Sequence, residues 1–274
     1  MRYLLFCAAL LITISACSKT EEQPEEEKYF GPEEVEWELV WEDNFDTDGL
    51  PDNNIWDYEE GYIRNNEAQY YTKERLENAR VEDGNLVIEA RKDNWNEHEI
   101  TSASLHTYGK KSMLYGKIEV RAKLPTGKGT WPAIWMLGNS IRNGTGWPEC
   151  GEIDIMENVG YDPNVIHANI HTKAYNHGIG TNKGDKMTVE KPYKEFHTYT
   201  VEWFEHKLAF FIDDTLYFTF YNENSGNDTW PFDKAHYLII NLAIGGAWGG
   251  QQGIDDNIFP QKYYIDYVKV YKQK

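Results

Sequence analysis

The sequence predicts an all-β protein built as a sandwich of antiparallel sheets. Runs of β-branched and aromatic residues recur along the chain, and clusters of Gly, Pro, Asn and Asp separate them, for example in residues 125–130, 222–228 and 244–253. Several runs alternate between apolar and polar residues with a period of two. No long segment has the spacing of an amphipathic helix. Many strands joined by turn signals are typical of a sandwich.

The expected strands follow in chain order. Within GKIEVRAKLP, the side chains of Ile118, Val120 and Ala122 share one face, and charged residues share the other. The Asp213–Asp214 pair predicts a hairpin within the long run 197–220. Further strands are expected in residues 85–91, 197–212, 215–220, 236–244 and 263–271. Since we find no repeat and no second linker, we expect one folded domain over residues 37–274.

The N-terminal residues predict export. Residues 1–16 have Arg2, an apolar run from Leu4 to Ile14 and small residues, as in a signal peptide. Ile14-Ser-Ala-Cys17 resembles a bacterial lipobox, so we expect a lipid on Cys17 and a location at the outer membrane or cell surface of a Gram-negative bacterium. The alternative is an ordinary secretory signal with a chance Cys. Residues 17–36 are acidic and predict a disordered tether.

The amino-acid composition limits the classes of molecule that the protein is expected to bind. The chain has 274 residues and a formal net charge of −18, which disfavours nucleic acid and anionic membrane surfaces. Aromatic residues make up 15%, with ten Trp and nineteen Tyr, and such rings suit both packed sheets and stacking on sugars. Cys150 is alone in the expected domain, so no disulfide can form there. We expect a neutral substrate, a monomer and no cofactor for catalysis.

The stretch GWPECGEIDIMENVG, residues 146–160, carries an irregular set of acids. In a regular strand Glu152 and Asp154 share one face, whereas Glu157 would point into the core, where an unpaired carboxylate costs several kcal/mol. A β-bulge around Met156 would return Glu157 to the face of the other two acids. The parity of the sequence therefore predicts a bulge.

Three carboxylates on one sheet face repel one another and separate their pKa values. Glycoside hydrolysis needs that separation, because one carboxylate must be ionised while another holds a proton. The alternatives are a calcium site or a solvated acidic face. Spacing alone leaves catalysis and these structural roles open. A Cys–His nucleophile at Cys150 is a further alternative, against a small packed thiol.

Here a family resemblance adds to the residues. GEIDIME resembles the E-x-D-x-x-E signature of glycoside hydrolase family 16, and LVWEDNFD, NNEAQYYT, GKGTWPAIWMLG, FHTYTVEW, NLAIGGAWGG and YYIDYVKVY resemble its laminarinase-like branch in the same order. The resemblance covers roughly 230 residues. It implies a concanavalin A-like β-jelly-roll sandwich with a concave substrate cleft. It also implies Glu152 as nucleophile, Asp154 as its helper and Glu157 as acid/base.

The same resemblance suggests binding residues. It associates His171 with the acid/base and implies that Asn65 and Asn241 hydrogen-bond sugar hydroxyls. We expect Trp131, Trp135, Trp147 and Trp248 to be stacking platforms, the last because its Gly-rich loop is a poor place for a core residue. In many relatives the residue matching Asp266 binds a structural Ca²⁺, which carbonyls near Asn44 and Gly84 would complete.

The resemblance implies a retaining endo-β-1,3-glucanase acting on laminarin-like glucan. Mixed-linkage glucan and sulfated galactan are alternative substrates, and a non-catalytic glycan-binding surface lipoprotein is an alternative class. The acidic charge favours a neutral glucan over sulfated chains. Presence of all three acids favours an enzyme over a lectin-like protein.

Overall fold

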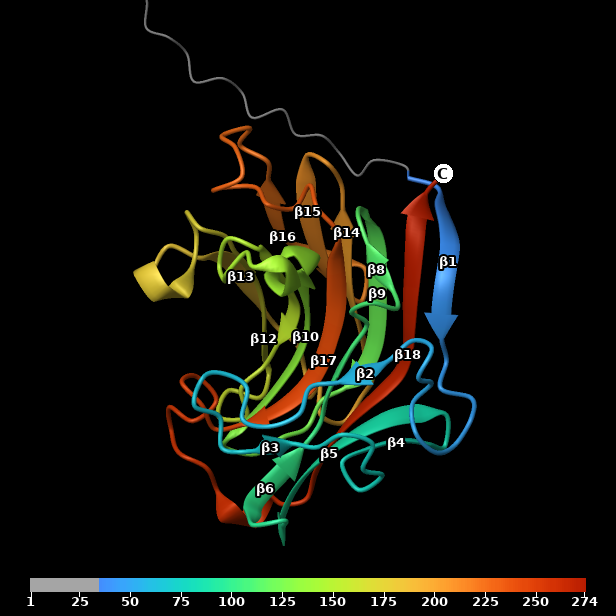
Figure 1. The fold of residues 1–274 in the computed structure, drawn as a ribbon, viewed down its shortest axis with the longest axis vertical. Coiled ribbons are helices and arrows are strands. Elements are labelled where there is room, and N and C mark those ends of the chain that lie inside the picture. Colours follow the sequence, from blue (N-terminus) through green and yellow to red (C-terminus); the bar gives the residue numbers. More distant parts are fainter. Residues whose placement is uncertain (1–34) are drawn as a thin grey trace, which may run out of the picture. The chain divides into compact units, whose positions relative to one another are not determined.

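Two β-sheets dominate residues 35–274, the part of the chain that the computed structural model describes (Figure 1). The predicted signal peptide, the lipidation site Cys17 and nearly all of the predicted tether lie outside the described residues. The strand pairs are antiparallel, apart from one short parallel pair formed by β3 and β6. The predicted sandwich of antiparallel sheets is therefore confirmed.

The larger sheet has ten strands, of which eight form a continuous path and two attach at its side. In order, the path is β16 (Thr215–Tyr221), β15 (Lys207–Ile212), β14 (His197–Trp203), β9 (Gly116–Lys123), β18 (Gln261–Gln273), β5 (Asn85–Trp95), β6 (His98–Ser102) and β3 (Tyr70–Tyr71), while β1 (Trp37–Asp43) pairs with β18 and β4 (Ala79–Glu82) pairs with β5.

The smaller sheet has eight strands and carries the three predicted catalytic acids together with Trp131, Trp135, His171 and Asn241. In order, it contains β13 (Lys183–Thr188), β12 (Val165–His171), β11 (Glu152–Glu157), β10 (Thr130–Gly138), β17 (His236–Ile244), β7 (Ser104–His106) and β2 (Asp57–Tyr58), while β8 (Ser112–Met113) pairs with β17. Three short 3₁₀ helices lie in loops, at Asn139–Asn143, His177–Ile179 and Asp256–Ile258.

The hydrophobic core fills the space between the sheets. Along β9 buried and half-buried residues alternate strictly, as predicted, and Ile118 and Val120 are fully buried. They belong to the same apolar cluster as Ile134 of β10 and Ile240 of β17, from the other sheet. This cluster occupies the inner face of each sheet. The outer face of the smaller sheet is therefore available for a functional site.

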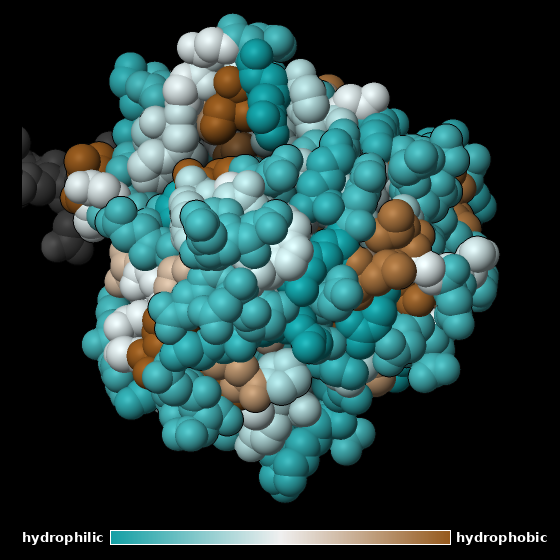
Figure 2. Space-filling model, turned by 60° about the horizontal axis from the view of Figure 1, so that its bottom comes forward, coloured by the Kyte–Doolittle hydropathy of each residue, from teal (hydrophilic) through white to brown (hydrophobic). Residues whose placement is uncertain are grey.

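The molecular surface in one view is largely polar. The face shown in Figure 2 is mostly hydrophilic, with small and separate hydrophobic patches. Within residues 35–274 we find no helix that combines the length and apolar character of a membrane span.

Candidate active site

A β-bulge in β11 places the three acids on one face of the sheet. Asp154 pairs with Asn169 of β12, and Glu157 pairs with His167, so two residues of β11 lie opposite one residue of β12. The two are Ile155 and Met156, and both side chains are fully buried in the core. The register against β10 shifts at the same place. The predicted bulge is confirmed, and it consists of two successive core residues.

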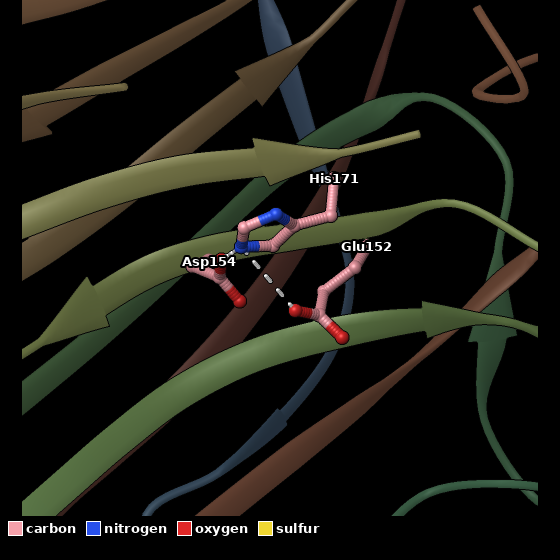
Figure 3. Close-up of side chains that lie close together, drawn as sticks. All are labelled: Glu152, Asp154 and His171. Atoms are coloured by element: carbon pink, nitrogen blue, oxygen red, sulfur yellow. Dashed lines mark ion pairs between the residues drawn. The ribbon is translucent and has the colours of Figure 1, made fainter. Parts of the chain in front are cut away.

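Glu152, Asp154 and Glu157 consequently face away from the core. His171, on the neighbouring strand β12, lies between the first two: its Nε2 is 3.3 Å from Asp154 Oδ2 and 3.6 Å from Glu152 Oε1 (Figure 3). Asp154 and His171 are buried, and the side chain of Glu152 is 14% exposed. These three residues are also the only group of potential metal ligands found among residues 35–274, with ligating atoms within 4.8 Å of one another.

Each of the two outer acids receives a hydrogen bond from a tryptophan. The indole nitrogen of Trp131 donates to Glu157 Oε1 at 3.0 Å, and that of Trp147 donates to Glu152 Oε2 at 3.1 Å. Asn169 Nδ2 also donates to Glu157 Oε2, at 3.3 Å. In contrast, Asp154 Oδ2 is buried and makes no hydrogen bond, and its contact is with His171 Nε2 at 3.3 Å. The outer carboxylates are therefore oriented by indole donors, whereas the middle acid depends on the imidazole of His171.

Burial raises the pKa of all three acids above the usual carboxyl range. The charge of Asp154 raises the pKa of Glu152 and Glu157 further, whereas His171 lowers the pKa of both. The hydrogen bonds from Trp131 and Asn169 also lower the pKa of Glu157. Burial and the repulsion between neighbouring carboxylates therefore both favour protonation within the cluster. Carboxyl groups with raised pKa values that lie side by side in a cleft are suited to acid–base chemistry.

The acids lie on the floor of a cleft of about 860 Å³. Every predicted substrate-binding residue lines it together with the acids, namely Asn65, Trp131, Trp135, Trp147, His171, Asn241 and Trp248. The rings are not equivalent, however. The side chain of Trp147 is exposed, whereas Trp135 is only 7% exposed and lies under the guanidinium of Arg64, 4.9 Å from the ring centroid. Trp135 therefore forms part of the floor rather than an open platform.

A hydrogen-bonded chain connects this floor to the loop before β3. Trp135 Nε1 donates to Asn241 Oδ1 at 2.8 Å, and Asn241 Nδ2 donates to the Tyr71 hydroxyl at 2.9 Å. That hydroxyl donates to Glu67 Oε2, and Asn65 Nδ2 donates to Glu67 Oε1. The polar side chain of Asn241 in an apolar strand thus has a defined partner on each side.

Trp248 is half-buried at the rim of the cleft. Its ring meets Trp131 edge-on at 5.6 Å between centroids, and it meets His167 edge-on at 4.9 Å. The loop that carries it turns sharply at Gly245 and Gly246, each with a φ of 74°. Only glycine adopts this backbone readily, so the Gly-rich composition is required to bring Trp248 over Trp131.

His171 and Cys150 were both singled out from the sequence. The family resemblance placed His171 near Glu157, and the charge of His171 lowers the pKa of Glu157. Its ring also contacts Asp154 and Glu152, because the antiparallel register sets His171 opposite Glu152. Cys150 is a buried free thiol whose pKa burial raises to about 12, so it packs as an uncharged group and is no nucleophile.

The comparisons with known proteins agree with this geometry. Residues 66–269 match the profile of Glycosyl hydrolases family 16. The chain belongs to this family. It is 51% identical over 244 residues to a beta-glucanase of Rhodothermus marinus, covering 86% of this chain and 85% of that protein.

Solved structures of the family share the fold. The laminarinase from Rhodothermus marinus superposes with a TM-score of 0.85 at 49% identity, covering 88% of this chain and 99% of the other. A non-specific endo-β-1,3(4)-glucanase, solved with a 1,3-β-D-cellobiosyl-glucose at its active site, has a TM-score of 0.82 at 49% identity, covering 86% and 95%. The chain is therefore a family 16 glycoside hydrolase with the jelly-roll fold.

The residues that the family resemblance suggests as calcium ligands lie in or beside strands of the larger sheet. Strand β18 pairs with β5 as far as Ile265 and with β1 from Val268 onwards, and Asp266 lies between these two stretches. Gly84 lies in the turn before β5, and Asn44 directly follows β1. The Asp266 carboxylate is ion-paired with Arg121. The donor set is a hard oxygen set, as Ca²⁺ prefers.

Sequence reasoning missed several residues of the cleft. Arg64 is ion-paired with Glu59, and both line the cleft from the loop after β2. His177 lies over Trp147, with 4.9 Å between the ring centroids. Asn169 has the same strand parity as His167 and His171, and that parity could have identified it. Nothing local in the sequence marks Arg64 or His177.

Proposed function

We propose that this family 16 enzyme is a retaining endo-glycosidase that hydrolyses β-1,3-glucosidic bonds in laminarin-like β-glucans. The observation that carries the proposal is the buried row of acids on the cleft floor, with an indole donor fixed on each outer carboxylate. The glucanase and laminarinase names of the similar proteins support the choice of substrate. Aromatic walls beside the acids suit the apolar faces of glucosyl rings.

In the first step, Glu157 protonates the glycosidic oxygen while a carboxylate oxygen of Glu152 attacks C1 of the glucosyl residue. The bond between C1 and the leaving oxygen breaks, and a glycosyl-enzyme ester forms on Glu152. Burial raises the pKa of Glu157, as a proton donor requires, and His171, which lies 3.6 Å from Glu152, lowers the pKa of the nucleophile and favours its ionised form. The Trp147 hydrogen bond holds Glu152 in one orientation for attack.

In the second step, Glu157 takes a proton from water as the water oxygen attacks C1, and the bond to Glu152 breaks. Two inversions at C1 give net retention. Asp154 lies beside Glu152 and shares the ring nitrogen of His171 with it. We assign Asp154 the role of tuning the proton affinity of the nucleophile, because a charge on Asp154 raises the pKa of Glu152.

Product analysis tests this proposal. Wild-type enzyme should release laminari-oligosaccharides from laminarin, and NMR should show the β-anomer as the first product. A mixed-linkage glucanase is the second candidate, because a similar solved protein is named a non-specific endo-β-1,3(4)-glucanase. Parallel digests of lichenan, agarose and carrageenan separate the alternatives. Binding without cleavage of any of the four polymers would identify a glycan-binding protein instead.

We also propose that the enzyme is an exported monomer anchored by a lipid on Cys17, at the outer membrane or cell surface. The lipobox-like Ile14-Ser-Ala-Cys17 sequence supports the anchor. Replacing Cys17 by Ser should move the activity from the membrane fraction to the soluble fraction. A variant that stays with the membrane would contradict the anchor, and light scattering of the released enzyme would check the monomer.

We propose in addition that Asp266, with carbonyls of Asn44 and Gly84, holds a structural Ca²⁺. The register of β18 supports the site, because it places Asp266 between the residues that pair with the end of β1 and those that pair with the start of β5. When bound, the ion would tie three segments of the larger sheet together, far along the chain from the acids. Chelation should lower the melting temperature if the folded protein alone binds the ion. Identical melting curves with and without chelator would contradict the site.

A further inference from the structure

A cluster of one exposed and three half-buried rings lies outside the residues that line the cleft. It contains Tyr62, Tyr70, Trp95 and His98, which come from the loop after β2, from β3 and from the β5–β6 hairpin. The rings of Tyr70 and His98 stack at 3.7 Å with an interplanar angle of 12°, and Tyr62 meets both rings edge-on at 5.5 and 5.6 Å. Trp95 lies 6.3 Å from Tyr70. Tyr62 itself is 60% exposed.

The cluster is held in a fixed arrangement. The Tyr62 hydroxyl and His98 Nδ1 are 3.2 Å apart, which is within hydrogen-bond distance. The guanidinium of Arg75 lies over the Trp95 ring at 5.1 Å, and Arg75 is itself ion-paired with Asp93. A binding surface that is already ordered costs less conformational entropy when a ligand arrives. Core packing does not require this arrangement, because the outermost ring stays in water.

The cluster is continuous with the cleft through two pairs of neighbouring residues. Ile63 lines the cleft, is 42% exposed and directly follows Tyr62. In β3, Tyr71 is fully buried and joins the hydrogen bonds of the cleft floor, whereas Tyr70 joins the cluster, because successive side chains of a strand point to opposite sides. The same two segments therefore present one side to the cleft and the other to the cluster.

We propose that this aromatic cluster is a distal glucan-binding site for a chain that extends beyond the cleft past Ile63. The inference rests on the proposed function, since it assigns the site to the same neutral β-1,3-glucan. An exposed ring stacks on the apolar face of a glucosyl residue, and the surrounding polar surface leaves its hydroxyls in water. Long chains would occupy both the cleft and the cluster, whereas short oligosaccharides would occupy only the cleft. Two linked contacts increase affinity by raising the effective concentration at the second one.

Binding of two ligands to a hydrolysis-deficient Glu152→Gln background tests this site. The ligands are long-chain laminarin and laminaritriose, and calorimetry or affinity electrophoresis measures binding. Adding Tyr62→Ala should weaken laminarin binding about tenfold, which corresponds to roughly 1.4 kcal/mol. Binding of laminaritriose should be unchanged. Tyr62→Phe keeps the ring and should keep the affinity for laminarin.

The control is Tyr221→Ala, because Tyr221 is also an exposed tyrosine, at 51%, but lies on β16, at the opposite end of the larger sheet from β3. It should change neither affinity. If Tyr62→Ala does not fold, Tyr62→Leu keeps apolar bulk without the ring and provides the same comparison. Unchanged laminarin binding in the ring-free variant, or an equal loss for both ligands, would overturn the distal site. Failure of the wild-type enzyme to cut laminarin would instead overturn the proposed function.

Discussion

The indole nitrogen of Trp131 donates a hydrogen bond to Oε1 of Glu157 at 3.0 Å, and this contact favours the ionised form of the acid. Trp131→Phe keeps an aromatic ring but removes the donor, so the pKa of Glu157 should rise. A general acid works while it is protonated, and activity falls as pH rises through its pKa. We therefore expect the alkaline limb of the kcat/KM profile to move to higher pH.

Hydrolysis of laminarin or an activated aryl glucoside across pH would measure this shift. Trp147→Phe is the matched variant, because it removes the indole donor from Glu152 instead. It should move the acidic limb to higher pH and leave the alkaline limb in place. Identical profiles for the two variants would mean that the indoles do not act on separate acids.

His171 should influence both limbs. Its charge lowers the pKa of Glu152 and of Glu157, and its Nε2 lies close to Asp154. In His171→Ala both pKa values should rise, so the whole bell-shaped profile should move to higher pH, with a lower maximum because the carboxylates lose a positioning contact. If the maximum of the profile falls but its position on the pH axis does not change, His171 only positions the carboxylates and does not alter their pKa values.

The buried acids should reduce the stability of the fold at neutral pH. A carboxyl whose folded-state pKa is raised destabilises the folded protein above its ordinary pKa, and has no such effect when both states are protonated. Asp154 is 3% exposed, and its Oδ2 has no hydrogen-bond partner. We expect Asp154→Asn to raise the free energy of unfolding at pH 7 by roughly 1–3 kcal/mol.

Chemical denaturation at two pH values checks this expectation. The gain should shrink as pH falls toward the ordinary aspartate pKa of about 4. Hydrolytic activity should fall at the same time, because the charge beside Glu152 is lost. Equal stability of wild type and variant at pH 7 would show that Asp154 is well solvated or compensated.

Substitution of Trp248 tests whether the aromatic rim of the cleft binds glucan. Its ring contacts Trp131 and His167 only edge-on, and it lies in a loop rather than in the core. Trp248→Ala should weaken glucan binding by roughly 1–3 kcal/mol, as expected for loss of a large apolar contact. The melting temperature should change little. A large drop in melting temperature would assign the ring to packing instead.

Physical reasons decide which features of the acid cluster could be predicted from the sequence. The bulge could be predicted because Glu157 cannot be placed in the core without cost, so parity alone required an extra residue. The partner of each acid could not be predicted, because it depends on the register between β11 and β12. That register sets His171 opposite Glu152 and His167 opposite Glu157.

Contacts between residues that are far apart in the sequence could not be predicted from local sequence patterns either. Trp131 was expected to stack on sugar, and its position in the cleft agrees, yet its hydrogen bond spans 26 residues of chain. Arg64 covers Trp135 from a loop whose sequence contains no motif for that contact. The fold class was easier to predict, since strand alternation is local and each sheet buries one face.

The central claim is that Glu152 and Glu157 have different chemical roles, and chemical rescue of two variants tests it most directly. Glu152→Gly lacks the nucleophile but keeps the base, so it should couple an α-glucosyl fluoride to an acceptor without hydrolysing the product. Glu157→Ala lacks the acid/base, so with an activated aryl glucoside it should form the ester on Glu152, and azide should release a β-glucosyl azide. These two distinct products are the result we expect. The same response of both variants to both reagents, or an α-configured azide from Glu157→Ala, would contradict the assigned roles.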